Sequence, residues 1–176
     1  MSAMGSELNI VERTDAYCVA QVSNVSVVVW NRAPSESGLD AVHVRLMKAA
    51  ADNPDKMGML LIARTKQSPV EGANKKAAAA MRELGLRLKA VAVVTGGSDF
   101  WSKVVRVSLH AILGVVRATG SGPQEAAFFA TPTEAAKWLG DVLEKQHIQG
   151  ATSSQLVAAM ERLEKAFPPP PPSVRA

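Results

Sequence analysis

The chain has 176 residues, of which 47% are hydrophobic and 20% are charged. This length and composition suit one globular domain with a buried core, and they exclude an intrinsically disordered chain. The net charge of +4 is spread along the sequence without the dense basic run that nucleic-acid binding usually shows, so we expect no nucleic-acid partner.

The first predicted elements are two strands and a helix. Two β-rich runs, Tyr17–Val22 and Val25–Trp30, are separated by the turn residues Ser23 and Asn24, which predicts a hairpin. Apolar residues then recur at helical spacing until Asn53 and predict a first helix. These residues are Leu39, Val42, Leu46, Met47 and Ala50.

The middle of the chain alternates between buried strands and helices. Residues 57–63 and 88–95 are apolar on both strand faces, as in central strands that are covered on both sides. Between them, Ser68 and Glu71 form a capping-box pattern with Pro69 in the first helical position, which predicts that a second helix starts there. Ser98 is expected to cap a third helix ending near residue 118. This third helix is apolar over most of its circumference, so we expect it to be the most buried one.

The last third of the chain contains a short strand and two capped helices. Residues 126–130 form the strand, and Thr131 with Glu134 caps the fourth helix. Thr152 with Gln155 caps a tail helix that ends before the five prolines 168–172. The tail helix has an apolar face made of Leu156, Val157, Met160, Leu163 and Phe167. That face must pack either on its own domain or on another molecule.

The element order predicts an α/β fold. We expect a mixed sheet of about five strands, opened by a hairpin and covered by about four helices, with an extra C-terminal amphipathic helix. The expected organisation is an N-terminal segment (1–14), one domain (15–147), the amphipathic helix (148–167) and a proline-rich tail (168–176). The strands at 57–63 and 88–95 should be parallel neighbours, because one helix joins them.

Four segments together resemble the STAS, or anti-sigma-factor-antagonist (SpoIIAA-like), fold family. They are Val27-Val28-Val29-Trp30, Met59-Leu60-Leu61-Ile62, Ala90-Val91-Ala92-Val93-Val94 followed by Gly97-Ser98-Asp99-Phe100, and residues 128–139. The resemblance implies a non-enzymatic switch that binds a partner protein. Some members are phosphorylated on a Ser or Thr at the start of the second helix, just after an Asp. Here the resemblance implies Thr65 or Ser68, although Arg64 stands where the acid would be. A purely structural loop is the alternative.

Catalytic chemistry finds no support in the sequence. His43, His110 and His147 are far apart and have no metal-binding spacing, and the single cysteine, Cys18, can form no intrachain disulfide. We therefore expect no enzyme, no bound metal and no cofactor. No apolar run is long enough to span a bilayer, and residues 1–13 lack a secretory signal. We expect a soluble cytoplasmic protein.

Four basic residues are predicted to share one stripe of the third helix: Lys103, Arg106, His110 and Arg117. The stripe is either a solvated face or a docking edge for an acidic partner or an anionic ligand. Our leading hypothesis is a bacterial regulatory or scaffold module that binds a partner protein through its STAS-like surface, with the tail residues Leu156, Met160, Leu163 and Phe167 as a second contact. The alternative is a small-molecule or lipid-binding domain with an anionic ligand near the basic stripe. Self-association is compatible with either.

Overall fold

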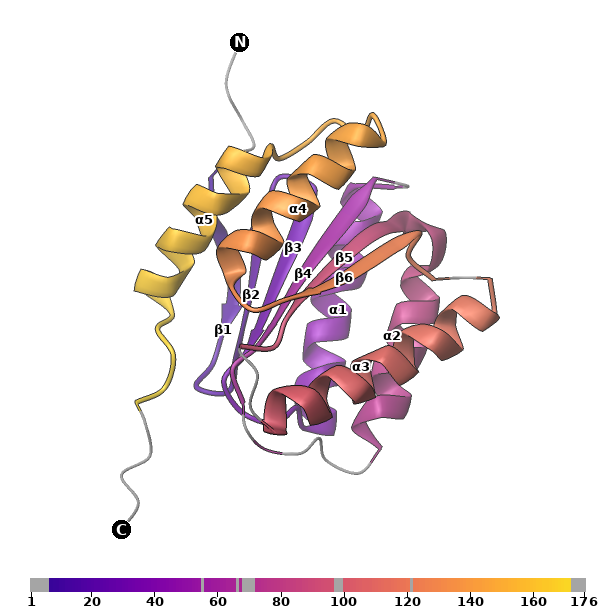
Figure 1. Cartoon of the computed structure of the whole chain (residues 1–176), viewed down its shortest axis with the longest axis vertical. Helices are drawn as coiled ribbons and strands as arrows, with labels where there is room; N and C mark the ends of the chain where they lie inside the picture. Colours follow the sequence, from indigo (N-terminus) through magenta and orange to yellow (C-terminus); the bar gives the residue numbers. More distant parts are fainter. Residues whose placement is uncertain are drawn as a thin grey trace.

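One mixed sheet organises the protein (Figure 1). The computed structural model describes residues 7–54, 56–65, 67, 72–96, 100–120 and 122–171. Within these residues six strands lie side by side in the order of the chain. They are β1 (Asn9–Arg13), β2 (Tyr17–Val22), β3 (Val25–Trp30), β4 (Met57–Ala63), β5 (Leu88–Val94) and β6 (Glu125–Phe129). The first three strands are antiparallel and β3 to β6 are parallel, so the expected α/β class is confirmed.

The opening hairpin forms as expected, but a further strand precedes it. β2 and β3 pair from Tyr17 opposite Trp30 to Val22 opposite Val25, and Ser23 in the turn has a positive φ of 53°. β1 pairs with β2, although it falls in the predicted N-terminal segment. This strand was missed because it is a short edge strand whose alternate residues are exposed, so its sequence lacks an apolar run.

The helices cover the sheet on two sides (Figure 1). α1 (Glu36–Asp52), α2 (Ala73–Leu84) and α3 (Phe100–Ala118) each connect two neighbouring parallel strands. Right-handed crossovers that advance in one direction place all three on one face. α4 (Pro132–Lys145) and α5 (Ser153–Ala166) lie on the opposite face, and a short 3₁₀ helix, η1 (Gly85–Arg87), precedes β5.

The hydrophobic core has one layer on each side of the sheet. Side chains alternate along the strands, so that Val28 packs towards α1 and α2 while Val27 and Val29 pack towards α4 and α5. β4 and β5 are parallel neighbours near the centre of the sheet, as predicted. Both strands are apolar at successive positions because helices cover both faces.

Side-chain caps fix the starts of α4 and α5, as Ser35 does for α1. Thr131 and Thr152 form complete capping boxes with Glu134 and Gln155 at the start of α4 and α5, as predicted. The expected start of α2 is wrong, because this helix begins at Ala73 after Gly72, whose φ of 82° is not helical. The predicted capping residues of α2 and α3, Ser68 and Ser98, and with them Pro69 and Glu71, lie outside the described residues.

Helix α3 is not the most buried helix, which corrects the sequence-based expectation. Val107 and Val115 on this helix are 69% and 52% exposed. Among the described side chains of α3, the buried ones lie on one side, where Ile112 and Val116 are in a cluster with Ala78 of α2. A continuous apolar circumference therefore indicates two apolar faces here, one packed and one open to solvent.

The tail helix α5 packs on its own domain. Its face residues Leu156, Met160, Leu163 and Phe167 are at most 6% exposed and belong to the core layer under α4. Two arginines hold its C-terminal end: Arg13 Nη1 donates to Ala166 O over 2.8 Å, and Arg64 Nη1 donates to Phe167 O over 2.6 Å. Of the two alternatives for this face, the intramolecular one is present, so the face needs no partner.

Candidate functional site

The basic stripe predicted on the third helix lies on the outer side of α3. Lys103, His110 and Arg117 are exposed, whereas Arg106 is half-buried and its Nε is buried without a hydrogen-bond partner. The His110 ring stacks on Phe128 of β6 with 4.2 Å between ring centroids. None of the four side chains forms an ion pair with another described residue. Within the part of the chain that the structure describes, no ion pair therefore compensates their charge.

The predicted phosphorylation site is described only in part. Thr65 follows β4 and is half-buried, and its Oγ1 accepts a hydrogen bond from Gln67 N over 3.0 Å. Ser68 lies outside the described residues. Phosphorylation of either residue stays a prediction.

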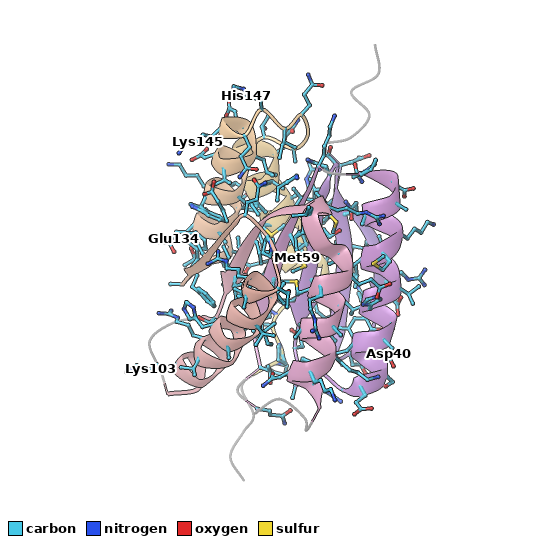
Figure 2. All side chains as sticks on the ribbon, turned by 90° about the vertical axis from the view of Figure 1, so that its right-hand side faces the viewer. Asp40, Met59, Lys103, Glu134, Lys145 and His147 are labelled. Carbon is cyan, nitrogen blue, oxygen red and sulfur yellow. The ribbon has the colours of Figure 1, made fainter. Side chains whose placement is uncertain are left out.

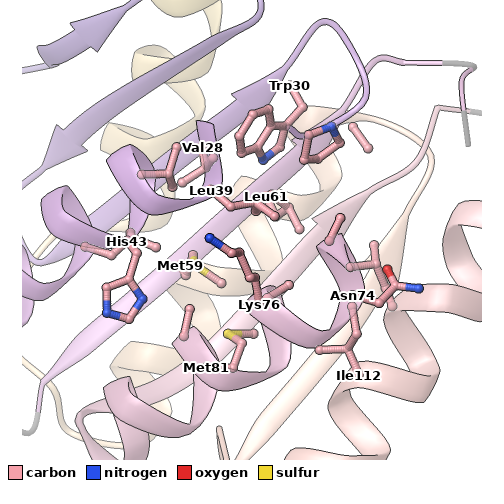
Figure 3. A pocket seen from close by; sticks show the side chains of 18 of the residues that line it. Val28, Trp30, Leu39, His43, Met59, Leu61, Asn74, Lys76, Met81 and Ile112 are labelled. Carbon is pink, nitrogen blue, oxygen red and sulfur yellow. The ribbon is translucent and has the colours of Figure 1, made fainter. Parts of the chain in front are cut away.

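A cavity of about 400 Å³ lies between the sheet and the helices α1, α2 and α3 (Figure 3). Trp30, Met59 and Leu61 line it from the strands, and Leu39 and Ile112 line it from α1 and α3. It reaches the carboxyl ends of β3 and β4, where the sheet residues Trp30 and Ala63 and the loop residue Thr65 line it. Ligands of parallel α/β sheets commonly bind at this edge.

The sequence of α2 explains why the cavity exists. Ala73, Ala77 and Ala80 line the cavity from this helix. Their short side chains leave the space between the helix and the strands unfilled, whereas α1 contributes Leu39 and Leu46. Close-packed protein interiors contain few voids larger than a water molecule. A space of this size is therefore a candidate ligand site.

The charged side chains around the cavity are paired with one another. Lys76 Nζ lies 2.8 Å from both carboxylate oxygens of Asp40, and the hydrogen bond to Asp40 raises the pKa of Lys76. His43 Nε2 lies 2.8 Å from Glu83 Oε2. Among the described residues, the polar lining that remains is neutral: Thr65, Gln67 and Asn74. The cavity therefore offers apolar contact and a few neutral hydrogen-bonding groups.

The cavity and the basic stripe lie on different sides of α3. From this helix, Leu109, Ile112 and Leu113 line the cavity, and no member of the stripe does. The sequence-based alternative was a bound ligand with an anionic group near the basic stripe. In the structure, α3 lies between the cavity and the stripe, so the two parts of that prediction fall on separate surfaces.

Two polar residues with structural roles were missed by sequence reasoning. Asn24 is 3% exposed; its Nδ2 donates to Lys56 O over 2.7 Å, and its Oδ1 accepts from Ala151 N over 3.1 Å. Arg64 packs over the Phe167 ring, 5.7 Å from its centroid, and burial lowers the pKa of its guanidinium. An Asn in a tight turn and an Arg directly after a buried strand were the available signals, but their partners Ala151 and Phe167 are more than 100 residues away.

The described parts of the chain offer neither a metal site nor an activated cysteine. These parts contain no group of three or more His, Cys, Asp or Glu side chains that could hold a metal ion. Cys18 is buried, and burial raises the pKa of its thiol, so it is poorly suited to act as a nucleophile. Across the same ranges, no helix combines the length and apolar character that crossing a membrane would require.

Comparisons with known proteins assign no family to the chain. No family model matches the sequence, and no curated protein matches it significantly.

Proposed function

We propose that the protein is a non-enzymatic binding protein for a small, mainly apolar molecule. The observation that carries this proposal is the cavity of about 400 Å³ under α1, α2 and α3. Small-molecule sites typically have about 300–1,000 Å³ and combine apolar walls with a few polar groups. The lining here, with Trp30, Met59 and Leu61 on one wall, has that character.

The pairing of charges defines the chemistry of the ligand. Among the described residues that line the cavity, a charged ligand group would find no free counter-ion, because Lys76 pairs with Asp40 and His43 with Glu83. Burying an unpaired charge is costly. The ligand we propose is therefore a neutral molecule with an alkyl or ring body. Thr65 or Asn74 could bind a single hydroxyl or carbonyl group on it.

The binding test uses the full chain and Nile red, a neutral apolar dye whose fluorescence rises in apolar surroundings, with 1-decanol as competitor. Ala77→Phe places a ring into the cavity and should weaken dye binding at least ten-fold. Ala158→Phe, at an exposed position of α5 on the other side of the sheet, is the matched control and should bind as the wild type does. Equal binding by all three proteins would place the dye elsewhere and contradict the proposal.

A second candidate is the regulatory or scaffold module that binds a partner protein through a STAS-like surface. The order of elements favours it, because an opening hairpin is followed by three strand–helix units in sequential order. Fold likeness alone is a weak basis for function. Repeated affinity purification from the native bacterial cytoplasm, where we place the protein, tests this candidate. Failure to recover any stoichiometric partner would count against it.

A further inference from the structure

The outer face of α3 has an unusual combination of side chains for a surface helix. The segment Phe100–Ala118 contains Lys103, Arg106 and Arg117 but no Asp or Glu. The same helix exposes Val107 and Val115, at 69% and 52%. Exposed charges on a solvated helix usually alternate in sign, with acids pairing the bases at neighbouring turns. Solvation alone therefore does not explain this face.

Helical geometry arranges these residues in two adjacent strips. Arg106, Arg117, His110 and Lys103 follow one another around the helix and form the basic strip. The apolar strip lies beside it and consists of Val107, Ala111, Gly114, Val115 and Ala118, all of which are exposed. The opposite side of the helix, with Ile112, Leu113 and Val116, is buried. Figure 2 shows Lys103 projecting away from the body of the protein.

We propose that this outer face of α3 docks on the surface of a lipid bilayer that contains anionic lipids. Interfacial helices combine a basic edge, which is attracted to negative headgroups, with an apolar edge that enters the boundary between headgroups and acyl chains. The two strips of α3 provide these edges side by side. The charge complementarity is direct, because no acid on the helix and no ion pair within the described residues compensates Lys103, Arg106 and Arg117.

The alternative occupants fit the two strips less well. Nucleic acids are bound chiefly through contacts to phosphates and would leave Val107 and Val115 unused. A second copy of the chain could cover the valines, but it would bring an identical basic strip and no acid on this helix to pair with it. The bilayer surface uses both strips.

Docking in this orientation places the cavity next to the membrane. The residues of α3 that line the cavity, Leu109, Ile112 and Leu113, lie on the side of the helix that faces away from the bilayer. One helix would thus separate an apolar ligand in the protein from the acyl chains of the membrane. This role in ligand exchange rests on the proposed function, whereas the docking itself does not require it.

The test is co-sedimentation of the full chain with vesicles of phosphatidylcholine containing 30% phosphatidylglycerol, compared with pure phosphatidylcholine. We expect binding to the anionic vesicles alone, weakening as salt rises. Lys103→Gln with Arg117→Gln should weaken binding by about five-fold for each charge removed. Val107→Ser with Val115→Ser should also weaken it, without lowering the melting temperature, because both side chains are exposed.

A matched control removes the same charge from the other side of the protein. Lys137→Gln with Lys165→Gln alters exposed residues of α4 and α5 and should leave vesicle binding unchanged. Equal losses in the two charge variants, or no binding to anionic vesicles, would overturn the proposal. So would a dimer without lipid that Val107→Ser with Val115→Ser converts to a monomer, because a second copy would then cover this face. Ala77→Phe should still bind vesicles after losing Nile red, which distinguishes failure of the docking from failure of the cavity proposal.

Discussion

Replacing single leucines of α5 with alanine measures how firmly the tail helix packs on the domain. Leu156 and Leu163 are 0% and 1% exposed and lie in the core layer with Leu139 and Leu143. A buried Leu→Ala change costs about 2–5 kcal/mol, and the cost is larger where the surroundings cannot collapse into the space. α5 has little room to move, because a Cβ on Gly140 of α4 would lie 2.5 Å from the backbone of Ser153. We therefore expect the upper half of that range, about 3.5–5 kcal/mol.

The assay is chemical denaturation of each variant, supported by thermal melts. For a chain of this size, 1 kcal/mol corresponds to about 2–4 °C in Tm, so each leucine variant should melt about 7–20 °C below the wild type. Glu161→Ala, at an exposed position of the same helix, is the control and should stay within about 0.5 kcal/mol. If both leucine variants were as stable as the control, α5 would not be packed on the sheet in solution, and the reasoning would be refuted.

Three further predictions concern single polar groups. Thr131→Ala removes the cap of α4 and should cost about 0.5–2 kcal/mol in denaturant titrations, and an unchanged midpoint would contradict its role. Asn24→Ala should lower the free energy of unfolding by about 2–4 kcal/mol in the same titrations, because it leaves Ala151 N without its buried acceptor. A decrease of less than about 0.5 kcal/mol would mean that this hydrogen bond is absent in solution. Burial and the hydrogen bond to Glu12 raise the pKa of Tyr17 from 10.0 to about 12, so the folded state keeps this proton to higher pH than the unfolded chain does. Stability should therefore fall between pH 10 and about 12, and Tyr17→Phe should remove that part of the fall.

Local signals in the sequence predicted the elements that depend on local chemistry. The hairpin around Ser23, the capping boxes at Thr131 and Thr152 and the two central strands all form as expected. In each case the deciding interaction lies within a few residues of the chain or follows from a continuous apolar run. The start of α2 is the exception, because Gly72 rather than Ser68 is its N-cap.

The features that escaped prediction depend on distant partners. Val107 lies on the second apolar face of α3, and it is exposed. Whether such a face is buried depends on whether another element of the fold covers it, so the sequence of the helix alone could not reveal this exposure. The cavity lies between the alanines of α2 and the side chains of Met59 and Leu61. The alanines are visible in the sequence, but which strand residues face them depends on how distant segments pack. The contact of Arg64 with Phe167 O joins residues 103 positions apart.

The bond from Arg13 to Ala166 O joins residues 153 positions apart, and this has a consequence for synthesis of the protein on the ribosome. Each of the helices α1 to α3 directly follows a strand of the parallel sheet, so that side of the sheet can be covered while the chain is still growing. The other side has to wait for α4 and α5, which leave the exit tunnel after all six strands. Until then Val27 and Leu60 on that side of the sheet lack their cover. Nascent chains of this protein should therefore recruit chaperones to that face until α4 and α5 have emerged.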